Sequence, residues 1–292
     1  MSHRADADLK EKMEANEFVT GEVVLSINGS PLKMEMTVPA APVKPHRMLP
    51  VFQKMTNAFV EASALTAGAL GSTISCRAGC GACCRQPVPL AEIEIYHLAE
   101  LVESMPEPRR TEIKRRFGEA AEHFASMSWF ERVHKIGLLT LTGAHALAGE
   151  RLQQATLDYF AEGVPCPFLE DESCSIHENR PLACREYLVT SPAINCSSPT
   201  PENISRVPIP ISPSSILWYL GKTGKFQGFI PLIRALEFAE RYPENFEEKT
   251  GERWAADFFG QLTNQTIPEP DDLKTGKSGS SDLPRSQKKG QK

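Results

Sequence analysis

Residues 76–84 read CRAGCGACC, and residues 166–196 read CPFLEDESCSIHENRPLACREYLVTSPAINC. Together these two stretches hold every cysteine of the 292-residue chain: Cys76, Cys80, Cys83, Cys84, Cys166, Cys174, Cys184 and Cys196. Free cysteines that only fill a core behave as small apolar residues and would be scattered along the chain. Their confinement to one segment indicates metal or redox chemistry.

The first stretch has the form of a metal-binding knuckle. Cysteines two or three residues apart, with Gly79 and Gly81 between them, allow a tight turn that brings several sulfurs to one point. Neighbouring side chains usually diverge, so one tetrahedral ion would have difficulty using both Cys83 and Cys84. The adjacent pair therefore favours two metal centres, or a multi-iron cluster with several attachment points.

The second stretch supplies four more ligands, which are Cys166, Cys174, Cys184 and Cys196. Eight thiolates match two four-sulfur sites. The sequence therefore predicts one or two centres of zinc, or of iron in an iron–sulfur cluster, with all eight cysteines as ligands. We expect the two groups of cysteines to meet in space, with sulfurs about 3.5–4 Å apart where they share a zinc ion.

Several other side chains near the cysteines are candidates for a supporting role. Four arginines adjoin the cysteines in sequence and are candidate cations facing the thiolates: Arg77, Arg85, Arg180 and Arg185. His177 follows Cys174 at zinc-ligand spacing, but eight cysteines already suffice, so we leave it out of the ligand set. We expect Glu92 and Glu94 to be exposed helix carboxylates, with extra ligands or acid–base groups as the alternative. No spacing singles out a catalytic cysteine and histidine, so no catalytic residue is assigned.

Outside the cysteine stretches, the periodicity of apolar residues predicts a mainly α-helical fold. Apolar residues recur every three to four positions in 49–70, 89–104 and 109–126, and the segment 144–161 also has a helical pattern. Shorter helical segments are predicted near 214–221, 229–242 and 245–264. The period is two on either side of Asn28-Gly29, which predicts an N-terminal β-hairpin.

These elements divide the chain into four parts. We expect a flexible N-terminus over 1–17, the β-hairpin and a Pro-rich connector over 18–47, a helical domain over 48–267, and a disordered tail over 268–292. The helical domain contains the cysteine-cluster segment 76–196. Because the stretch 164–201 is rich in proline and cysteine and has little periodicity, it cannot build a core alone and needs another organiser, such as a metal.

Composition narrows the function classes. With 32 Lys+Arg against 37 Asp+Glu, the net charge is −5, which argues against a nucleic-acid partner. A basic run at 109–116 is interleaved with glutamates and is expected to be a solvated helix face. We expect no membrane span, because no run of about 18 apolar residues exists. The first residues lack an apolar signal segment, so we expect the cytoplasm, where disulfides rarely persist.

The joint pattern resembles the YkgJ-type (CxxCxxCC) cysteine-cluster family, which is described as a zinc- or iron-chelating domain. The resemblance rests on the knuckle 76–84, the Cys-Pro-Phe-Leu turn 166–169, the Cys-Ser-Ile-His turn 174–177 and the Arg-Pro-x-x-Cys-Arg element 180–185. It implies metal binding. A flagellin lysine N-methylase carries a similar cluster, so the resemblance also leaves an enzymatic role open. His177 stands where the family often has an aromatic residue.

Three functions remain open from the sequence. The first is a metal-binding cysteine-cluster protein, or the cluster-bearing part of an enzyme that acts on a protein or a small molecule. The second is an interaction module held together by structural zinc, with no catalytic activity. The third is a radical S-adenosylmethionine enzyme, because the spacing Cys76-x3-Cys80-x2-Cys83 is the cluster-binding spacing of those enzymes. Ala82 stands where an aromatic residue is usual in those enzymes, and the alternating strand–helix pattern of a partial barrel is absent.

Overall fold

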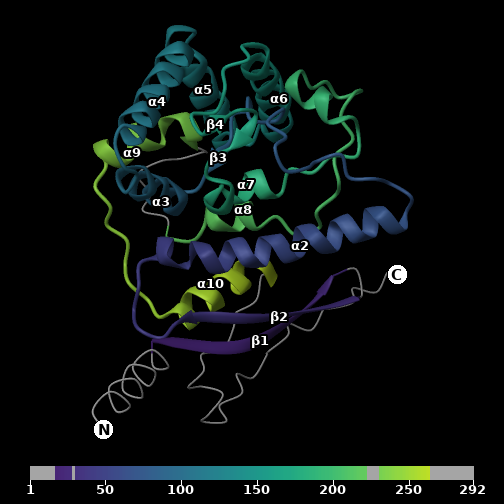
Figure 1. Ribbon diagram of the computed structural model, residues 1–292, viewed down its shortest axis with the longest axis vertical. Helices are drawn as coiled ribbons and strands as arrows, with labels where there is room; N and C mark the ends of the chain where they lie inside the picture. The colour runs from purple at the N-terminus through teal and green to yellow at the C-terminus, as the bar shows by residue number, and fades with distance from the viewer. Residues whose placement is uncertain (1–16, 28–29, 222–229, 264–292) are drawn as a thin grey trace, which may run out of the picture.

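The computed structural model describes residues 17–27, 30–221 and 230–263, and helices dominate them (Figure 1). The sheets among these residues are three antiparallel pairs, of which β1 (Phe18–Ile27) with β2 (Ser30–Pro39) is the longest. The predicted mainly α-helical fold with an N-terminal β-hairpin is confirmed. The predicted turn at Asn28-Gly29 and the predicted tail over 268–292 lie outside the described residues.

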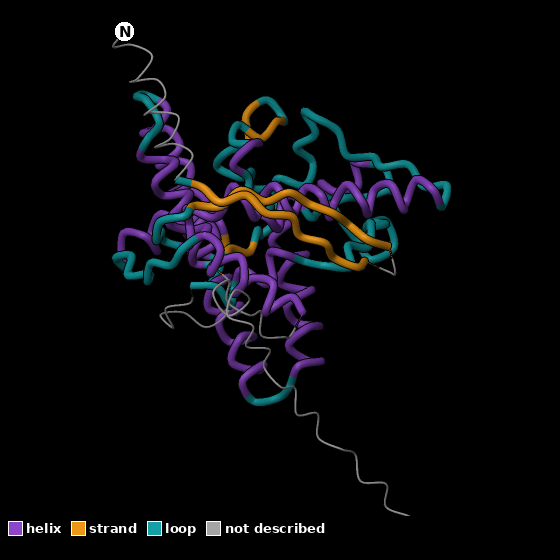
Figure 2. The backbone as a smooth tube through the Cα atoms, turned by 90° about the horizontal axis from the view of Figure 1, so that it is seen from below, coloured by secondary structure: helices purple, strands orange, loops and turns teal. Residues whose placement is uncertain are grey.

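The β1–β2 hairpin has one face toward the helices and one toward solvent (Figure 2). In β2 the side chains of Met36 and Val38 are buried, while Glu35 before them and Thr37 between them are exposed. This alternation follows from the two-residue period of a strand, which sends successive side chains to opposite faces. The apolar face covers α2 (Leu49–Ala69) and α10 (Gly251–Thr263).

The main core lies between this hairpin, α2 and α10. Phe52, Met55 and Phe59 follow helical spacing along α2 and are each at most 3% exposed. Phe52 stacks on Phe258 of α10 with ring centroids 4.9 Å apart. Close packing of large apolar side chains from three elements is what stabilises this half of the molecule.

A second layer is formed by α3 (Glu92–Glu103) and α9 (Ala235–Arg241), which pack on each other above α2 (Figure 1). The sequence predicted that the first of these helices begins at residue 89. It begins three residues later, because β3 (Pro89–Leu90) pairs with β6 (Ile230–Pro231) in extended conformation. The short elements η1 (Pro45–Met48), α8 (Pro213–Leu217) and η4 (Leu232–Arg234) connect these layers.

The third group of helices is α4 (Arg109–Ser126), α5 (Trp129–Leu141) and α6 (His145–Ala161), at the top of Figure 1. It has its own aromatic core, in which the rings of Phe124 and Tyr159 stack with centroids 3.8 Å apart and Trp129 packs against both. The helix α5 was not predicted from the sequence. Its apolar residues Trp129, Val133 and Ile136 do have helical spacing, and they are the signal that could have found it.

The cysteine-bearing segments join these helical layers without long elements of their own. Between α6 and α8 the chain forms β4 (Leu169–Glu170), β5 (Ser173–Cys174), η2 (His177–Asn179), α7 (Leu182–Arg185) and η3 (Ala193–Ser197). Phe168, Ile176, Leu182 and Val189 from this segment are nonetheless buried. No helix in the described part of the chain is long and apolar enough to cross a membrane.

Candidate metal centre

The first cysteine group lies on two consecutive tight turns. The N–H of Cys80 donates to the carbonyl of Arg77 (3.2 Å), and the N–H of Cys84 donates to the carbonyl of Gly81 (2.9 Å). Gly79 is the third residue of the first turn and has φ +74°, a conformation that favours glycine. The predicted knuckle geometry therefore has a local cause in the glycine positions.

Gly81 is where the first group contacts the second. A Cβ atom built on Gly81 would lie 2.6 Å from Leu169 Cδ1 and 2.8 Å from the carbonyl oxygen of Glu172. The N–H of Cys166 also donates to the carbonyl of Cys84 at 2.7 Å. Two groups that are far apart in sequence are thus joined by direct backbone contacts.

Each cysteine of the second group is carried by a different short element. Cys166 precedes the β4–β5 turn, Cys174 ends β5, Cys184 lies in α7 and Cys196 lies in η3. Asp171 and Glu172 both have positive φ values at the tip of the β4–β5 turn. A backbone bond from Ser75 N–H to the carbonyl of Val189 (2.9 Å) brings the end of this segment to the start of the knuckle.

The electrostatic interactions among the thiols divide six of them into two sets of three. Burial raises the pKa of Cys166 to about 12, and the nearby Cys174 and Cys83 thiols add to the rise. The pKa of Cys184 is raised by burial and then by the Cys166, Cys83 and Cys174 thiols. We call Cys166, Cys174 and Cys184 the second trio.

The other set combines the two sequence groups. Burial raises the pKa of Cys196 to about 11; a hydrogen bond from Tyr187 opposes the rise, and the Cys83, Cys76 and Cys80 thiols add to it. Burial also raises the pKa of Cys76, and the Cys83 and Cys80 thiols contribute again. We call Cys76, Cys80 and Cys196 the first trio.

Cys83 is the thiol that acts on members of both trios. A hydrogen bond between the Cys83 and Cys84 thiols raises the pKa of Cys83 most, followed by burial. One member of the adjacent pair, Cys83, therefore interacts electrostatically with members of both trios. Tyr187, which contacts Cys196, was not predicted, since no spacing in the sequence marks it.

Arg180 places a positive charge beside both trios. Its charge lowers the pKa values of Cys76, Cys83, Cys174 and Cys184. The Arg180 carbonyl accepts from Arg185 Nε at 3.0 Å, which holds the Arg180 backbone in place. The Arg180 Nε atom is buried and has no hydrogen-bond partner among the described residues. A buried N–H donor amid thiols suits sulfur ligands whose charge needs compensation, so the donor set fits a metal.

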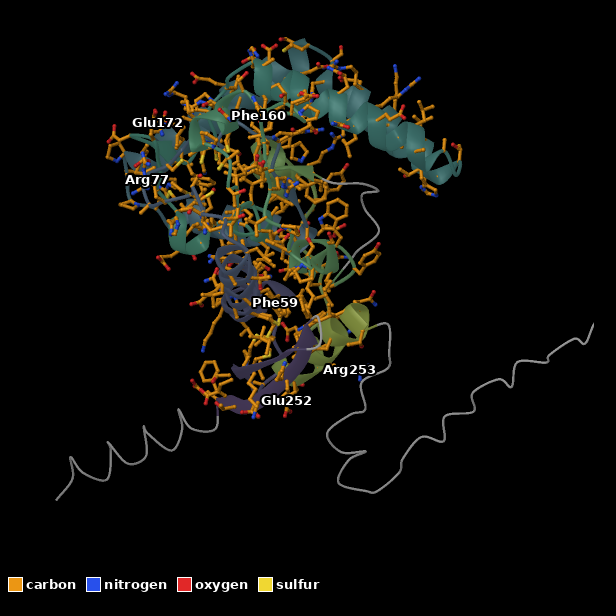
Figure 3. The ribbon with its side chains drawn as sticks, turned by 90° about the vertical axis from the view of Figure 1, so that its right-hand side faces the viewer. Phe59, Arg77, Phe160, Glu172, Glu252 and Arg253 are labelled. Carbon is orange, nitrogen blue, oxygen red and sulfur yellow. The ribbon has the colours of Figure 1, made fainter. Side chains whose placement is uncertain are left out.

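The other three candidate arginines are engaged differently. Arg85 pairs with Glu172 (Nη2 to Oε1, 2.6 Å), and Arg185 donates to Asn57 Oδ1 and to backbone carbonyls, which orders the loop before α7. Arg77 is exposed, on the same side of the molecule as Glu172 (Figure 3). Arg85 and Arg185 thus hold the loops that carry the cysteines.

All eight cysteines are free thiols. Among the described residues, which include all of them, no three His, Cys, Asp or Glu side chains lie close enough together to hold a metal ion. Metal binding would therefore require the thiol side chains to turn toward a common point. The assignment of the eight cysteines as ligands, and the expected sulfur spacing, stay predictions.

Two other candidates from the sequence lie away from the thiols. The side chain of His177 is 57% exposed, and its Nδ1 lies 3.8 Å from Glu178 Oε1. Glu94, expected to be an exposed carboxylate, is only 2% exposed, so that expectation is wrong. It accepts hydrogen bonds from the N–H groups of Ala91 (3.0 Å) and Leu182 (2.9 Å) and so joins the starts of α3 and α7.

Replacing Glu94 with alanine is expected to lower the free energy of unfolding by about 3 kcal/mol, because it leaves two buried N–H groups without acceptors. Urea denaturation measures this, with the exposed Glu122→Ala on α4 as the control. A loss no larger than that of the control would contradict the assigned role.

The same side chain predicts a pH dependence. Burial raises the pKa of Glu94 to about 7; its two N–H donors and the charge of Arg185 oppose the rise, and Glu186 adds to it. A carboxyl with a raised folded-state pKa stabilises the fold fully below its unfolded pKa and loses that contribution as the pH rises through its folded pKa. The free energy of unfolding of the unsubstituted protein, relative to that of Glu94→Gln, should therefore fall as the pH rises from about 5 to about 8.

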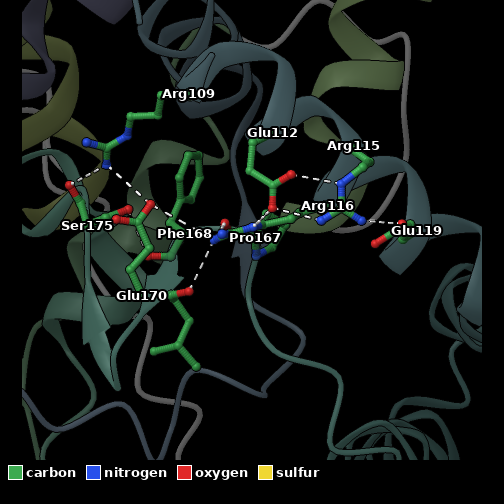
Figure 4. A network of polar contacts seen from close by, with 10 residues as sticks. Arg109, Glu112, Arg115, Arg116, Glu119, Pro167, Phe168, Glu170 and Ser175 are labelled. Carbon is green, nitrogen blue, oxygen red and sulfur yellow. Dashed lines mark hydrogen bonds and ion pairs between the residues drawn. The ribbon is translucent and has the colours of Figure 1, made fainter. Parts of the chain in front are cut away.

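The basic run on α4 supports the second cysteine group (Figure 4). Arg116 Nη1 donates to the carbonyls of Pro167 and Leu169, both at 3.4 Å, and Arg109 Nη2 donates to the carbonyl of Ser175 at 3.4 Å. Every basic side chain of the run is paired with a glutamate: Arg109 with Glu170, Arg110 with Glu107, Lys114 with Glu103, Arg115 with Glu112 and Glu119, and Arg116 with Glu112. The helix therefore clamps the β4–β5 turn, a role that the sequence did not reveal.

Eight free thiols on short turns, with the Arg180 guanidinium beside several of them, form a donor set that suits a metal. Residues 75–202 match the model of the CxxCxxCC family, which is described as a "putative zinc- or iron-chelating domain". The match includes all eight cysteines. The chain matches no curated protein and no solved structure.

Proposed function

We propose that residues 75–202 hold two metal centres, each bound by four cysteine thiolates. The observation that supports this proposal is that the Cys83 thiol interacts electrostatically with members of both trios and shares a hydrogen bond with Cys84. Each trio lacks one ligand of a four-sulfur site, and the pair supplies two. The two thiols share a hydrogen bond, so they would have to turn apart for each member of the pair to complete a different site.

Charge supports two centres and a resident cation. Eight thiolates carry eight negative charges, and two Zn²⁺ ions or two oxidised [4Fe–4S] cores return four positive charges. Four negative charges then remain for the protein to stabilise. Arg180, with its buried Nε and its effect on members of both trios, is placed to do so.

The experiment that tests this proposal is metal and sulfide analysis of anaerobically purified protein, with its visible spectrum. Two zinc ions per chain and a colourless solution would assign zinc. Brown protein with iron and labile sulfide would assign iron–sulfur, and with it electron transfer or cluster-assisted chemistry. Fewer than two centres per chain would contradict the proposal.

The proposed division of the ligands gives a sharper test. Cys174→Ser and Cys196→Ser should each halve the metal content, and the double variant should lose both centres, because the two residues belong to different trios. If the sites instead followed sequence order, the two residues would share one site and the double variant would keep half of the metal. Ser197→Ala, next to Cys196, is the control and should bind two centres.

A structural role for the metal is the second candidate. The observation that favours it is that Phe168, Ile176, Leu182 and Val189 are buried although the segment that carries them has almost no regular secondary structure. A closed four-thiolate site contributes folding energy and would order such a segment. This function requires no catalysis.

An enzymatic role completes the proposal. We propose that an iron–sulfur form would serve as the cluster-bearing part of an enzyme acting on a protein or a small molecule, in the reducing cytoplasm that eight free thiols suit. The radical S-adenosylmethionine alternative has less support, because the sheets of the described residues are two-stranded antiparallel pairs rather than parts of a parallel barrel. Cleavage of S-adenosylmethionine by the reduced protein would favour that alternative.

A further inference from the structure

A cavity of about 630 Å³ opens between α5 and α6, away from the cysteines in sequence. Its apolar lining includes Trp129, Val133, Ile136, Leu152 and Trp218. The volume lies within the range of small-molecule sites, which are about 300–1,000 Å³ and mostly apolar with a few polar groups. Trp218 is 37% exposed and offers apolar surface to a ligand, whereas Trp129 is buried beneath the lining.

The polar groups of the cavity are mostly hydrogen-bond donors. Two permanent cations and two histidines line it against one carboxylate: Lys135, Arg234, His134 and His145 against Glu131. The side chains of His134, Lys135 and His145 form no polar contact with other described residues. This imbalance suits a ligand that carries a negative charge.

Arg234 is held in a fixed position at the wall of the cavity. Its Nε and Nη2 bind Glu237 at 2.8 and 2.5 Å, and its Cζ lies 4.8 Å from the ring centroid of Phe130. Its Nη1 makes no hydrogen bond within the described residues and remains a donor. The pairing with Glu237 offsets the charge of Arg234, so Lys135 and the two histidines must supply most of the attraction for an anion.

The cavity is linked to the second trio through two aromatic side chains. Trp129, buried at the cavity, packs on Tyr159 with ring centroids 5.1 Å apart. The Cys166 thiol acts electrostatically on Tyr159, where it adds to the effect of burial in raising the pKa of that phenol. The indole N–H of Trp129 donates to the carbonyl of Ala155 (2.8 Å), which holds the buried ring in place.

We propose that this cavity binds a small amphipathic anion, an apolar body bearing one carboxylate. The apolar body packs against Trp218 and the aliphatic side chains of the lining, and the carboxylate accepts hydrogen bonds from Lys135 and His145 at the rim. The site goes beyond metal binding, and the proposal does not depend on which metal the cysteines hold.

The test is a titration of the full-length, metal-loaded protein with octanoate, followed by calorimetry and by tryptophan fluorescence. Saturable binding that changes the fluorescence is expected, and Trp218→Phe should remove most of that change. Octyltrimethylammonium has the same chain with a positive head group, and acetate has the head group alone. Both should bind at least ten-fold more weakly.

Charge reversal separates this site from non-specific binding. The double variant Lys135→Glu, His145→Glu should weaken octanoate binding at least ten-fold, while Lys54→Glu, an exposed lysine on α2, should leave it unchanged. All three altered residues are exposed, so the variants should fold, which a melting curve checks. Absence of saturable binding, equal binding of the cationic probe, or an unchanged double variant would each overturn the proposal.

Discussion

Gly81→Ala is expected to lower the free energy of unfolding by about 3 kcal/mol and to reduce the metal content. The added Cβ would lie 2.6 Å from Leu169 Cδ1 and within 2.9 Å of the carbonyl carbon and oxygen of Glu172. The leucine side chain can turn away, but the Glu172 backbone cannot, since it forms the tip of the β4–β5 turn. The knuckle must then move away from the second cysteine group.

The matched control for this variant is Gly79→Ala, two residues earlier in the same knuckle. Gly79 has φ +74°, and a Cβ added there would have no atom within 4 Å, so alanine meets only backbone strain of about 1 kcal/mol. Urea denaturation gives both free energies, and metal analysis gives both occupancies. Equal effects of the two substitutions would mean that the contact between the two cysteine groups contributes neither to the free energy of unfolding nor to metal binding.

Much of the helical scaffold could be predicted, because long amphipathic helices leave a clear period in the sequence. The segments 49–70 and 109–126 correspond closely to α2 and α4. The helix α5 was missed, although its apolar residues have helical spacing, because only Met127 and Ser128 separate it from α4. The start of α3 was placed too early, because pairing of Pro89–Leu90 with Ile230–Pro231 is a long-range contact that a local pattern does not carry.

The candidate site also has features that the sequence predicts and features that it does not. The eight cysteines and the importance of the Cys83–Cys84 pair are local features, and the sequence indicates both. The grouping of Cys196 with Cys76 and Cys80 depends on the path of the chain after α7, which no spacing encodes. The same holds for Glu94, whose contact with Leu182 crosses from one helix start to another.

The scaffold residues that the sequence missed share one property. The sequence predicts a solvated face for Arg109 and Arg116 because glutamates alternate with them. Arg116 does pair with Glu112 of the run, whereas Arg109 pairs with Glu170 of β4. The same guanidinium groups also donate to backbone carbonyls of the β4–β5 turn. A charged side chain can satisfy both partners, so its pairing within a helix does not exclude a role between elements.

Removal of the metal is expected to lower the melting temperature by more than about 10 °C and to loosen the segment 164–211 selectively. This segment has few regular backbone hydrogen bonds, so four-thiolate sites would be its main constraint. When they are lost, Phe168, Ile176, Leu182 and Val189 are held by their apolar contacts and by isolated hydrogen bonds, such as that from the Leu182 N–H to Glu94. Chelation of zinc, or oxidative breakdown of an iron–sulfur cluster followed by chelation, produces the metal-free protein.

Amide hydrogen exchange distinguishes this local effect from global unfolding. Exchange should rise by orders of magnitude over 164–211 and over the knuckle 76–84. It should change little in β2 and α10, whose packing against α2 through the Phe52–Phe258 stack contains no cysteine. Protection that returns when the metal is restored would show that the change is reversible. Unchanged melting and exchange after complete metal removal would exclude a structural role and leave the centres with a chemical function alone, because a metal that orders nothing must be retained for its reactivity.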